Sequence, residues 1–358
     1  MHTADAIDPA GTDARRLRID GLDVARALAI LGMVGSHTGD EGIRGADSDG
    51  WAWLAVTHGH PSALFAVLAG VSMSLMVTRR GTVPVAALPR ADLSQTRVRI
   101  AVRAMILIIL GFFMSALGTP VAVILGNLGV MFLLALPMLR WRPGVLLAGA
   151  AVFAAGGGWL ARAVTEAGAG AWPVVGALWS EHYPALAWMA YIMVGLAIGR
   201  MDLRSYARAL SLVAVGVVIA AAAWLAGWAL RTGSDASEAT IEGWLTDEDH
   251  SYTPVEMGLN IGVACAVIGL ALLVASRWPR ALWPLSATGS MALTLYVAHL
   301  FVIAFVGPEM VWEPSNVSFI ALALGLIAFA CAWRAAVGQG PLERMLTSAS
   351  TAVATPRR

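Results

Sequence analysis

Ten apolar segments, separated by short polar connections, run along the chain from Leu22 to Val337. A helix needs about 20 mostly apolar residues to cross the ~30 Å hydrocarbon core of a bilayer. We therefore predict an all-α polytopic membrane protein in which about ten transmembrane helices form one bundle. The predicted spans are residues 22–37, 61–78, 98–117, 120–139, 143–164, 184–200, 205–230, 255–276, 283–306 and 316–337.

Composition supports this class, because 58% of the residues are hydrophobic and only 13% are charged. The mean hydropathy is +0.71, which is too high for a single soluble core. The spans use most of the 358 residues, so we expect one transmembrane domain at 21–338. A cytoplasmic N-terminal tail (1–20) would precede it and a cytoplasmic C-terminal tail (339–358) would follow.

The distribution of arginine predicts the orientation in the membrane. Arg15, Arg16 and Arg18 precede the first span, and Arg277 and Arg280 follow the eighth. The opposite connections are acidic and poor in arginine. By the positive-inside rule, both termini face the cytoplasm and the acidic loops are extracytoplasmic. We expect a multi-pass protein of the cytoplasmic membrane, and we call the acidic side the predicted outer side.

Charge and sulfur chemistry exclude several roles. A net charge of +1 argues against nucleic acid as a partner, so membrane lipid is the expected surrounding. Cys265 and Cys331 lie within predicted spans and are interpreted as small buried apolar residues. No metal site is expected, because His58-x-His60 lacks nearby cysteines or a spaced carboxylate. The sequence leaves open whether the chain forms a homodimer.

The first span opens with Asp23 and Arg26, which share a helix face because they are three residues apart. One interpretation is a self-neutralised pair at the cytoplasmic boundary, with Arg26 reaching the inner headgroups. The other is a cation that helps to hold the phosphates of a cytoplasmic cosubstrate. The residues alone favour the first interpretation.

Three histidines gather at one pair of predicted helix ends on the outer side. His37 ends the first span, and His58 and His60 precede the second span, which Pro61 is expected to start. Imidazole is suited to moving protons near neutral pH, which makes this group a candidate for acid–base chemistry. His250 lies in the longest outer loop, where it is either a solvated residue or part of a substrate mouth.

Two further polar residues lie at membrane depth. Asn127 is inside the fourth predicted span, where it either joins helices or contacts a ligand. His299 lies in the ninth span, one turn after Tyr296. Ionisable residues within the bilayer are costly, so His299 is a strong functional candidate, with a satisfied core histidine as the alternative.

The segment GLDVARALAILGMVGSH resembles the opening helix of the transmembrane acyltransferase superfamily, in particular bacterial relatives of heparan-α-glucosaminide N-acetyltransferase. It is also similar to a neighbouring uncharacterised bacterial membrane family. The resemblance continues through HPSALFAVLAGVSMSLM, GNLGVMFLLALPMLR, YPALAWMAYIMVGLAIGR, HSYTPVEM, GSMALTLYVAHLF and GPLERML, which cover most of the chain.

This resemblance implies a membrane enzyme that transfers an acetyl or short acyl group from cytoplasmic acetyl-CoA. The acceptor would be an amine or hydroxyl of a sugar or amino sugar on the far side. Asp23 and Arg26 would help to bind the cosubstrate, His37 would be the general base with help from His60, and Asn127 and His299 would hold the acyl carbonyl or the acceptor. His58, His250 and Tyr296 would line the substrate mouth.

One departure concerns the catalytic histidine that eukaryotic members carry in the loop between the first two spans. The corresponding stretch here, RGADSDGWAWLAV, has no histidine. His37, His58 or His60 would have to take its role. Two other functions stay open from the sequence: a transporter of a small polar or lipid-linked molecule that relays protons through histidines, and a non-catalytic membrane scaffold.

Overall fold

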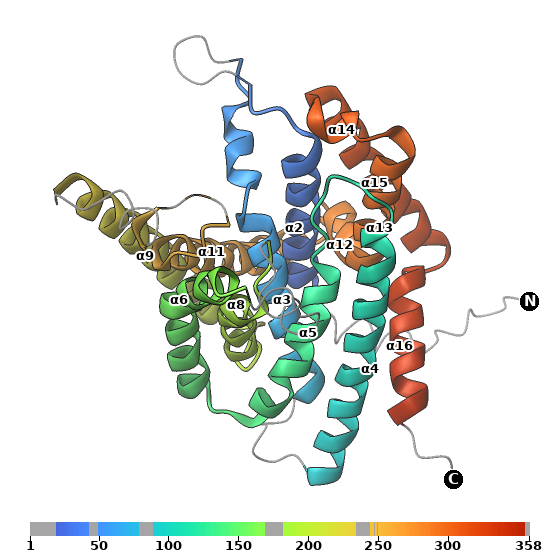
Figure 1. Cartoon of the computed structure of the whole chain (residues 1–358). Coiled ribbons are helices and arrows are strands. Elements are labelled where there is room, and N and C mark those ends of the chain that lie inside the picture. The colour runs from blue at the N-terminus through green and yellow to red at the C-terminus, as the bar shows by residue number, and fades with distance from the viewer. Residues whose placement is uncertain are drawn as a thin grey trace, which may run out of the picture.

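The computed structural model describes residues 19–42, 49–78, 89–168, 182–233, 244–246, 248 and 250–354. All regular secondary structure in these ranges is helical, which confirms the predicted all-α class (Figure 1). The elements are α2 (Asp20–Thr38), η1 (Ala52–Thr57), α3 (His60–Val77), α4 (Arg90–Ser115), α5 (Leu125–Ala135), η3 (Leu136–Arg140), α6 (Pro143–Glu166), α8 (Ala185–Ile198), α9 (Tyr206–Gly233), α11 (Pro254–Arg277), α12 (Trp283–Gly289), α13 (Ala292–Val306), α14 (Glu309–Trp312), α15 (Asn316–Ala336) and α16 (Pro341–Ala354).

Helices occupy each of the ten predicted segments, but not all meet the requirements for a membrane span. Among the described residues, six are long and apolar enough: Ala52–Val77, Arg90–Ser115, Pro143–Glu166, Tyr206–Thr232, Pro254–Arg277 and Asn316–Ala336. The pair α12 and α13 gives a seventh if it is counted as one span. Leu125–Arg140 and Ala185–Ile198 are shorter apolar helices. A membrane protein is therefore supported, while the count of ten spans stays a prediction.

The predicted span 283–306 is broken in the structure, since α12 and α13 meet at 78°. Gly289 ends α12 against α2, where an added Cβ would lie 1.6 Å from the backbone oxygen of Asp23. The carboxylate of Glu343 then accepts hydrogen bonds from the backbone N–H groups of Leu293 (2.8 Å) and Thr294 (3.1 Å). These contacts satisfy N–H groups at the start of α13, which a continuous helix would have bonded internally.

Helix starts follow ordinary capping rules at several positions. Pro61 and Pro143 stand in the first turns of α3 and α6, where the missing N–H of proline has no cost. Thr253 caps α11, because its side chain accepts a hydrogen bond from the backbone N–H of Glu256 at 3.1 Å. The sequence Thr-Pro-Val-Glu thus forms the Thr side of a capping box, with Glu256 three residues after the cap.

Helix α2 lies at the centre of the bundle, in contact with α3, α11, α12, α13, α14 and α15 (Figure 1). Helix α8 packs between α3 and α6, and α9 packs along α11. Glycine permits the closest of these contacts: an added Cβ on Gly195 of α8 would lie 2.0 Å from the backbone oxygen of Val67 in α3. Small residues allow helices in lipid to approach in this way.

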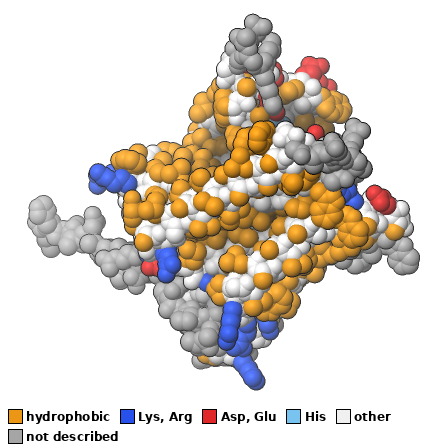
Figure 2. All heavy atoms as spheres, turned by 90° about the vertical axis from the view of Figure 1, so that its left-hand side faces the viewer, with side chains coloured by type: hydrophobic (Ala, Val, Ile, Leu, Met, Phe, Trp, Pro, Cys, Tyr) orange, Lys and Arg blue, Asp and Glu red, His pale blue; other side chains and the backbone are white. Residues whose placement is uncertain are grey.

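A broad apolar surface covers the face of the molecule shown in Figure 2. Helices α6 and α9 contribute large exposed apolar side chains to the surface of the bundle, among them Val152, Trp159, Val218, Trp224 and Trp228. Such an area would be an aggregation site in water, whereas hydrocarbon solvates it. The surface therefore agrees with membrane lipid as the surrounding of this chain.

The segment predicted as a C-terminal tail contains α16, which packs along α4. The guanidinium of Arg103 in α4 donates to the hydroxyls of Ser350 (3.2 Å) and Thr347 (3.5 Å). Residues 1–18, most of the predicted N-terminal tail, lie outside the described residues.

Candidate functional site

Helices α2 and α13 bring two candidate histidines together at the predicted outer end of α2. The rings of His37 and His299 are stacked, with centroids 5.4 Å apart and an interplanar angle of 15°. The ring of Tyr296 stands edge-on to His299 at 5.0 Å, and its hydroxyl accepts a hydrogen bond from the backbone N–H of Ile124 at 3.3 Å. The structure thus places three predicted site residues side by side.

This His37–His299 pair is poorly supplied with hydrogen-bond partners. His299 is completely buried, and neither of its ring nitrogens makes a well-oriented hydrogen bond to a described residue, although the backbone of Leu295 and Tyr296 lies close to the ring. His37 keeps some exposure, but its Nδ1 is buried and likewise has no partner there. A neutral imidazole offers one donor and one acceptor, and burying them unpaired is unfavourable. Such atoms are suited to contact a bound molecule.

A second candidate histidine belongs to a different network. Nδ1 of His60, in the first turn of α3, forms a short hydrogen bond with Oδ1 of Asn260 in α11. The amide nitrogen of Asn260 donates to Glu256 Oε1 at 3.1 Å and to the hydroxyl of Tyr191 at 3.1 Å. Asn260 and Glu256 are both buried.

The loop before α11 surrounds the Glu256 carboxylate. It accepts hydrogen bonds from the backbone N–H groups of His250 (3.2 Å) and Tyr252 (2.5 Å) and from the hydroxyl of Ser251 (3.2 Å). The hydroxyl of Tyr252 in turn donates to the carbonyl of His182 and contacts Nδ1 of His250 at 2.7 Å.

Burial changes the acid–base properties of this loop. It lowers the pKa of His250 and is the largest cause of the shift; the neighbouring His182 lowers this pKa through its charge and raises it through a backbone hydrogen bond. Burial also raises the pKa of Tyr252 in this loop and, to about 12, that of Tyr183 in the segment before α8. Burial therefore favours the neutral forms of these side chains, while a place for His250 in a substrate mouth stays a prediction.

The remaining outer candidates have partners of their own. Nε2 of His58 lies 2.8 Å from Glu41 Oε1. The amide nitrogen of Asn127 donates to the carbonyl of Tyr183 at 2.9 Å, which joins α5 to the segment before α8. A contact of Asn127 with ligand stays a prediction.

Asp23 and Arg26 lie at the opposite end of α2. Arg26 Nη1 lies 2.6 Å from Asp23 Oδ1, and Nη2 donates to Ser72 Oγ in α3 at 2.9 Å. Asp23 is buried and the Arg26 side chain is 24% exposed. The two side chains form an ion pair, and Arg26 also ties α2 to α3 through Ser72, a contact that neither interpretation of the sequence included. A contact of the pair with the inner headgroups or with a cosubstrate stays a prediction.

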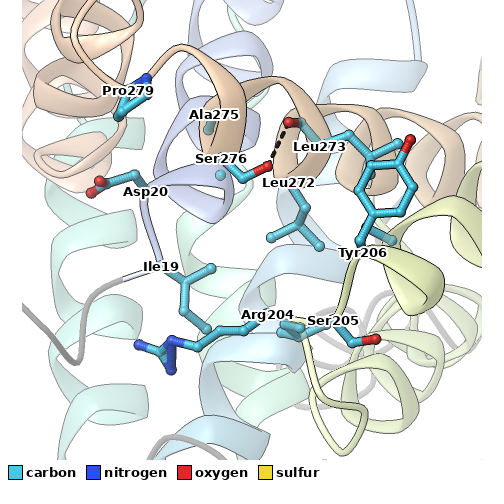
Figure 3. A pocket seen from close by; sticks show the side chains of 13 residues that line it. Ile19, Asp20, Arg204, Ser205, Tyr206, Leu272, Leu273, Ala275, Ser276 and Pro279 are labelled. Atoms are coloured by element: carbon cyan, nitrogen blue, oxygen red, sulfur yellow. Dashed lines mark hydrogen bonds between the residues drawn. The ribbon is translucent and has the colours of Figure 1, made fainter.

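A pocket of about 300 Å³ opens near the same end of α2 (Figure 3). It lies between the start of α2, the start of α9 and the end of α11. Asp20 and Arg204 are exposed among its lining residues, and Leu272 and Ala275 are buried there. Its charged lining residues are of both signs.

Sequence reasoning missed Glu256, Asn260 and Tyr191. Asn260 and Glu256 were detectable, since both are polar residues within the predicted span 255–276 and lie one helical turn apart. Their connection to His60 was not detectable, because Asn260 lies 200 positions after His60 in the sequence.

Comparison with known protein families agrees with a membrane acetyltransferase family for this chain. A family model described as heparan-alpha-glucosaminide N-acetyltransferase, catalytic, matches residues 18–232, and one described as protein of unknown function (DUF418) matches residues 198–352. No curated protein and no solved structure matches the chain. The first model covers more than half of the 358 residues. The resemblance found in the sequence is thus confirmed, and the chain belongs to the heparan-α-glucosaminide N-acetyltransferase catalytic family.

Proposed function

We propose that this protein is a membrane acyltransferase. It moves an acetyl or short acyl group from cytoplasmic acyl-CoA to an amine or hydroxyl of a sugar-like acceptor on the outer side. The His37–His299 pair is the observation that carries the proposal, because its buried ring nitrogens make no well-oriented hydrogen bond to any described residue and lie beside a tyrosine ring. The family supports acetyl transfer as the reaction and acetyl-CoA as the donor.

The chemistry requires a proton acceptor and a group that stabilises the developing negative charge. The acceptor nitrogen or oxygen attacks the thioester carbonyl carbon, the C–S bond breaks, and the proton passes by way of the base to the CoA thiolate. His37 or His60 is the general base. A ring N–H of His299 donates to the carbonyl oxygen, where a hydrogen bond strengthens as negative charge develops.

The donor would enter from the Asp23–Arg26 end of α2. Arg26 retains N–H groups beyond the two that contact Asp23 and Ser72, so it can still donate to a phosphate. Because Asp23 neutralises its charge, we expect Arg26 to contribute to CoA binding without dominating it. The linkage between binding and stability provides the test.

The first experiment measures the stability of the detergent-purified protein with acetyl-CoA, using dephospho-CoA and desulfo-CoA as controls. A donor at a hundredfold excess over Kd stabilises by about 2.7 kcal/mol. Arg26→Ala should reduce the shift, whereas Arg334→Ala, in the last turn of α15, should not. If no CoA species shifts the stability, acyl-CoA is not the donor.

The second experiment measures acetyl transfer to glucosamine and other amino sugars. Removing a general base lowers the rate about 10²- to 10⁴-fold. At least one of His37→Ala and His60→Ala should show this loss, while Ser36→Ala, beside His37, keeps the rate. Normal turnover in both histidine variants would show that neither residue is the base.

A transporter is the second candidate, and the break between α12 and α13 favours it. Discontinuous helices form substrate sites in many transporters. This function predicts pH-driven uptake into proteoliposomes without covalent change of the substrate and with no need for acyl-CoA. Transfer of a labelled acetyl group to the acceptor separates the two functions.

A further inference from the structure

The hydrogen bonds from Glu256 through Asn260 to His60 form one continuous chain, which we call the Glu256–Asn260–His60 chain. It connects α11 to the first turn of α3, and thereby joins the regions matched by the two family models. Asn260 is 2% exposed and Glu256 is 3% exposed. A buried polar network of this kind has a definite direction, which can be worked out from its donors and acceptors.

The direction follows from the Glu256 carboxylate. Donors contact both of its oxygens: the backbone N–H groups of His250 and Tyr252, the hydroxyl of Ser251 and the amide nitrogen of Asn260. A carboxylate only accepts, so Asn260 must present its NH₂ group to Glu256. The flipped amide would place Oδ1 against the carboxylate and lose that hydrogen bond.

The amide orientation determines the tautomer of His60. With its NH₂ group directed to Glu256 and Tyr191, Asn260 has only Oδ1 to offer to the imidazole. Oδ1 accepts, so Nδ1 of His60 must carry the proton. In the neutral ring Nε2 then holds a lone pair, and no described residue donates to it.

The backbone beside Glu256 supports this interpretation. His250 and Tyr252 have φ values of 61° and 53°, in the left-handed region that non-glycine residues seldom adopt. Each such residue costs about 1–3 kcal/mol. Both donate their N–H groups to Glu256, so the surrounding loop is built to hold one carboxylate in place.

We infer that Glu256 and Asn260 are positioning residues that hold His60 as the Nδ1–H tautomer, so that Nε2 takes the proton from the attacking amine or hydroxyl. The inference rests on the proposed acyl transfer and chooses His60 rather than His37 as its base. Nε2 receives the acceptor proton as the new C–N or C–O bond forms. It returns that proton to the CoA thiolate after the C–S bond breaks, which leaves His60 neutral as before.

The test observes the tautomer directly, by nitrogen-15 NMR of the purified protein with labelled histidine. The His60 signals are assigned by their loss in His60→Gln. The inference expects a protonated Nδ1 and an unprotonated Nε2 in the unaltered chain. In Glu256→Gln the new NH₂ group can donate to Asn260, which then turns its own NH₂ group toward His60 and favours the Nε2–H tautomer.

Activity should follow the tautomer. We expect kcat to fall about 10- to 100-fold in Glu256→Gln, since a correctly protonated base is worth about 10²–10⁴. KM for acetyl-CoA should not change. Cys265→Ala, a buried residue on the same helix, is the matched control for both readouts.

A double variant separates positioning from folding. In Glu256→Gln/Asn260→Asp the residue at 260 again accepts from His60 Nδ1 and also accepts from the residue at 256. It should therefore restore the Nδ1–H tautomer and recover at least part of kcat. A merely structural role for Glu256 predicts no recovery of either readout, since the second substitution changes another buried residue.

The outcomes distinguish this inference from the proposed function. An Nε2–H tautomer in the unaltered chain overturns the inference, as does Glu256→Gln with unchanged tautomer and unchanged kcat. Absence of transfer with every acyl-CoA, together with the expected tautomer, refutes the acyltransferase function and the role of His60 as its base. In that case only the assignment of the tautomer survives.

Discussion

Replacing His299 by phenylalanine tests whether the protein keeps this histidine for function rather than for packing. His299 is 0% exposed, and neither ring nitrogen makes a well-oriented hydrogen bond to a described residue. Phenylalanine preserves an aromatic ring beside His37 and Tyr296 and removes both polar atoms. We therefore expect His299→Phe to stabilise the fold while it impairs transfer, the usual trade-off at a functional site.

The magnitude follows from the two nitrogens. A buried polar group without a partner costs about 1–3 kcal/mol, and slight overpacking by the larger ring offsets part of the gain. We expect a net increase of about 1–3 kcal/mol in the free energy of unfolding. If His299 donates to the acyl carbonyl oxygen, transfer should fall about 10²- to 10³-fold, as for the loss of one such donor.

The measurement is reversible unfolding in mixed micelles, followed by tryptophan fluorescence, together with the acetyl transfer assay. Tyr296→Phe is the matched control, one turn away on α13. Its hydroxyl accepts from the backbone N–H of Ile124 at 3.3 Å, so its removal should cost about 1 kcal/mol. If His299→Phe instead loses more than about 1 kcal/mol, the ring nitrogens are satisfied in the folded protein and the argument is wrong.

Four further substitutions test the fold and the loop. Gly289→Ala should lower the free energy of unfolding by about 1–3 kcal/mol or more, because its Cβ would lie 1.6 Å from the backbone oxygen of Asp23. Gly325→Ala is the control: an added Cβ there meets open space, so the substitution should stabilise α15 by about 0.5–1 kcal/mol in the same unfolding assay. Glu343→Ala should cost about 0.5–2 kcal/mol and lower the helical circular dichroism of α13, since it removes the acceptor for two N–H groups. The pKa of His250 is lowered from 6.5, so the unfolded chain binds more protons than the folded chain below that pH. Stability should thus fall as the pH drops through 6.5 toward the folded-state pKa, and His250→Gln should flatten this part of the profile; an unchanged slope would contradict the cause assigned here.

Much of the fold was readable from the hydrophobic pattern. The start of α3 was expected from Pro61. Gly195 and Gly199 are small residues one turn apart in the predicted span 184–200, a spacing typical of close helix packing, and an added Cβ at either would disrupt the contact. The break after Gly289 was not, because its causes are a contact with α2 and a cap from Glu343, 54 residues away in α16. The sequence around Gly289 alone does not indicate contacts with residues so distant along the chain.

The candidate site was likewise predictable from the sequence only in part. The cost of polar residues in lipid identifies His37 and His299 singly, since each is unusual in its own span. Their stacking depends on how α2 meets α13, and the link from His60 to Asn260 depends on how α3 meets α11. These contacts depend on how the helices pack, and one hydrophobic pattern is compatible with many packing arrangements.

Helix α2 places a geometric requirement on any donor that serves both of its ends. Asp23 and His37 are fourteen residues apart, which is ~21 Å along a helix that rises 1.5 Å per residue. A molecule that touches both must be long and thin, with its charged part at one end and its reactive carbon at the other. Acyl-CoA has this form, whereas a short activated acyl compound could reach only one end. If a short donor proved as effective as acyl-CoA, the Asp23–Arg26 pair would have no role in donor binding. Its function would then be structural, to hold α2 against α3 through the contact of Arg26 with Ser72. The chemistry would then lie wholly with the histidines at the other end.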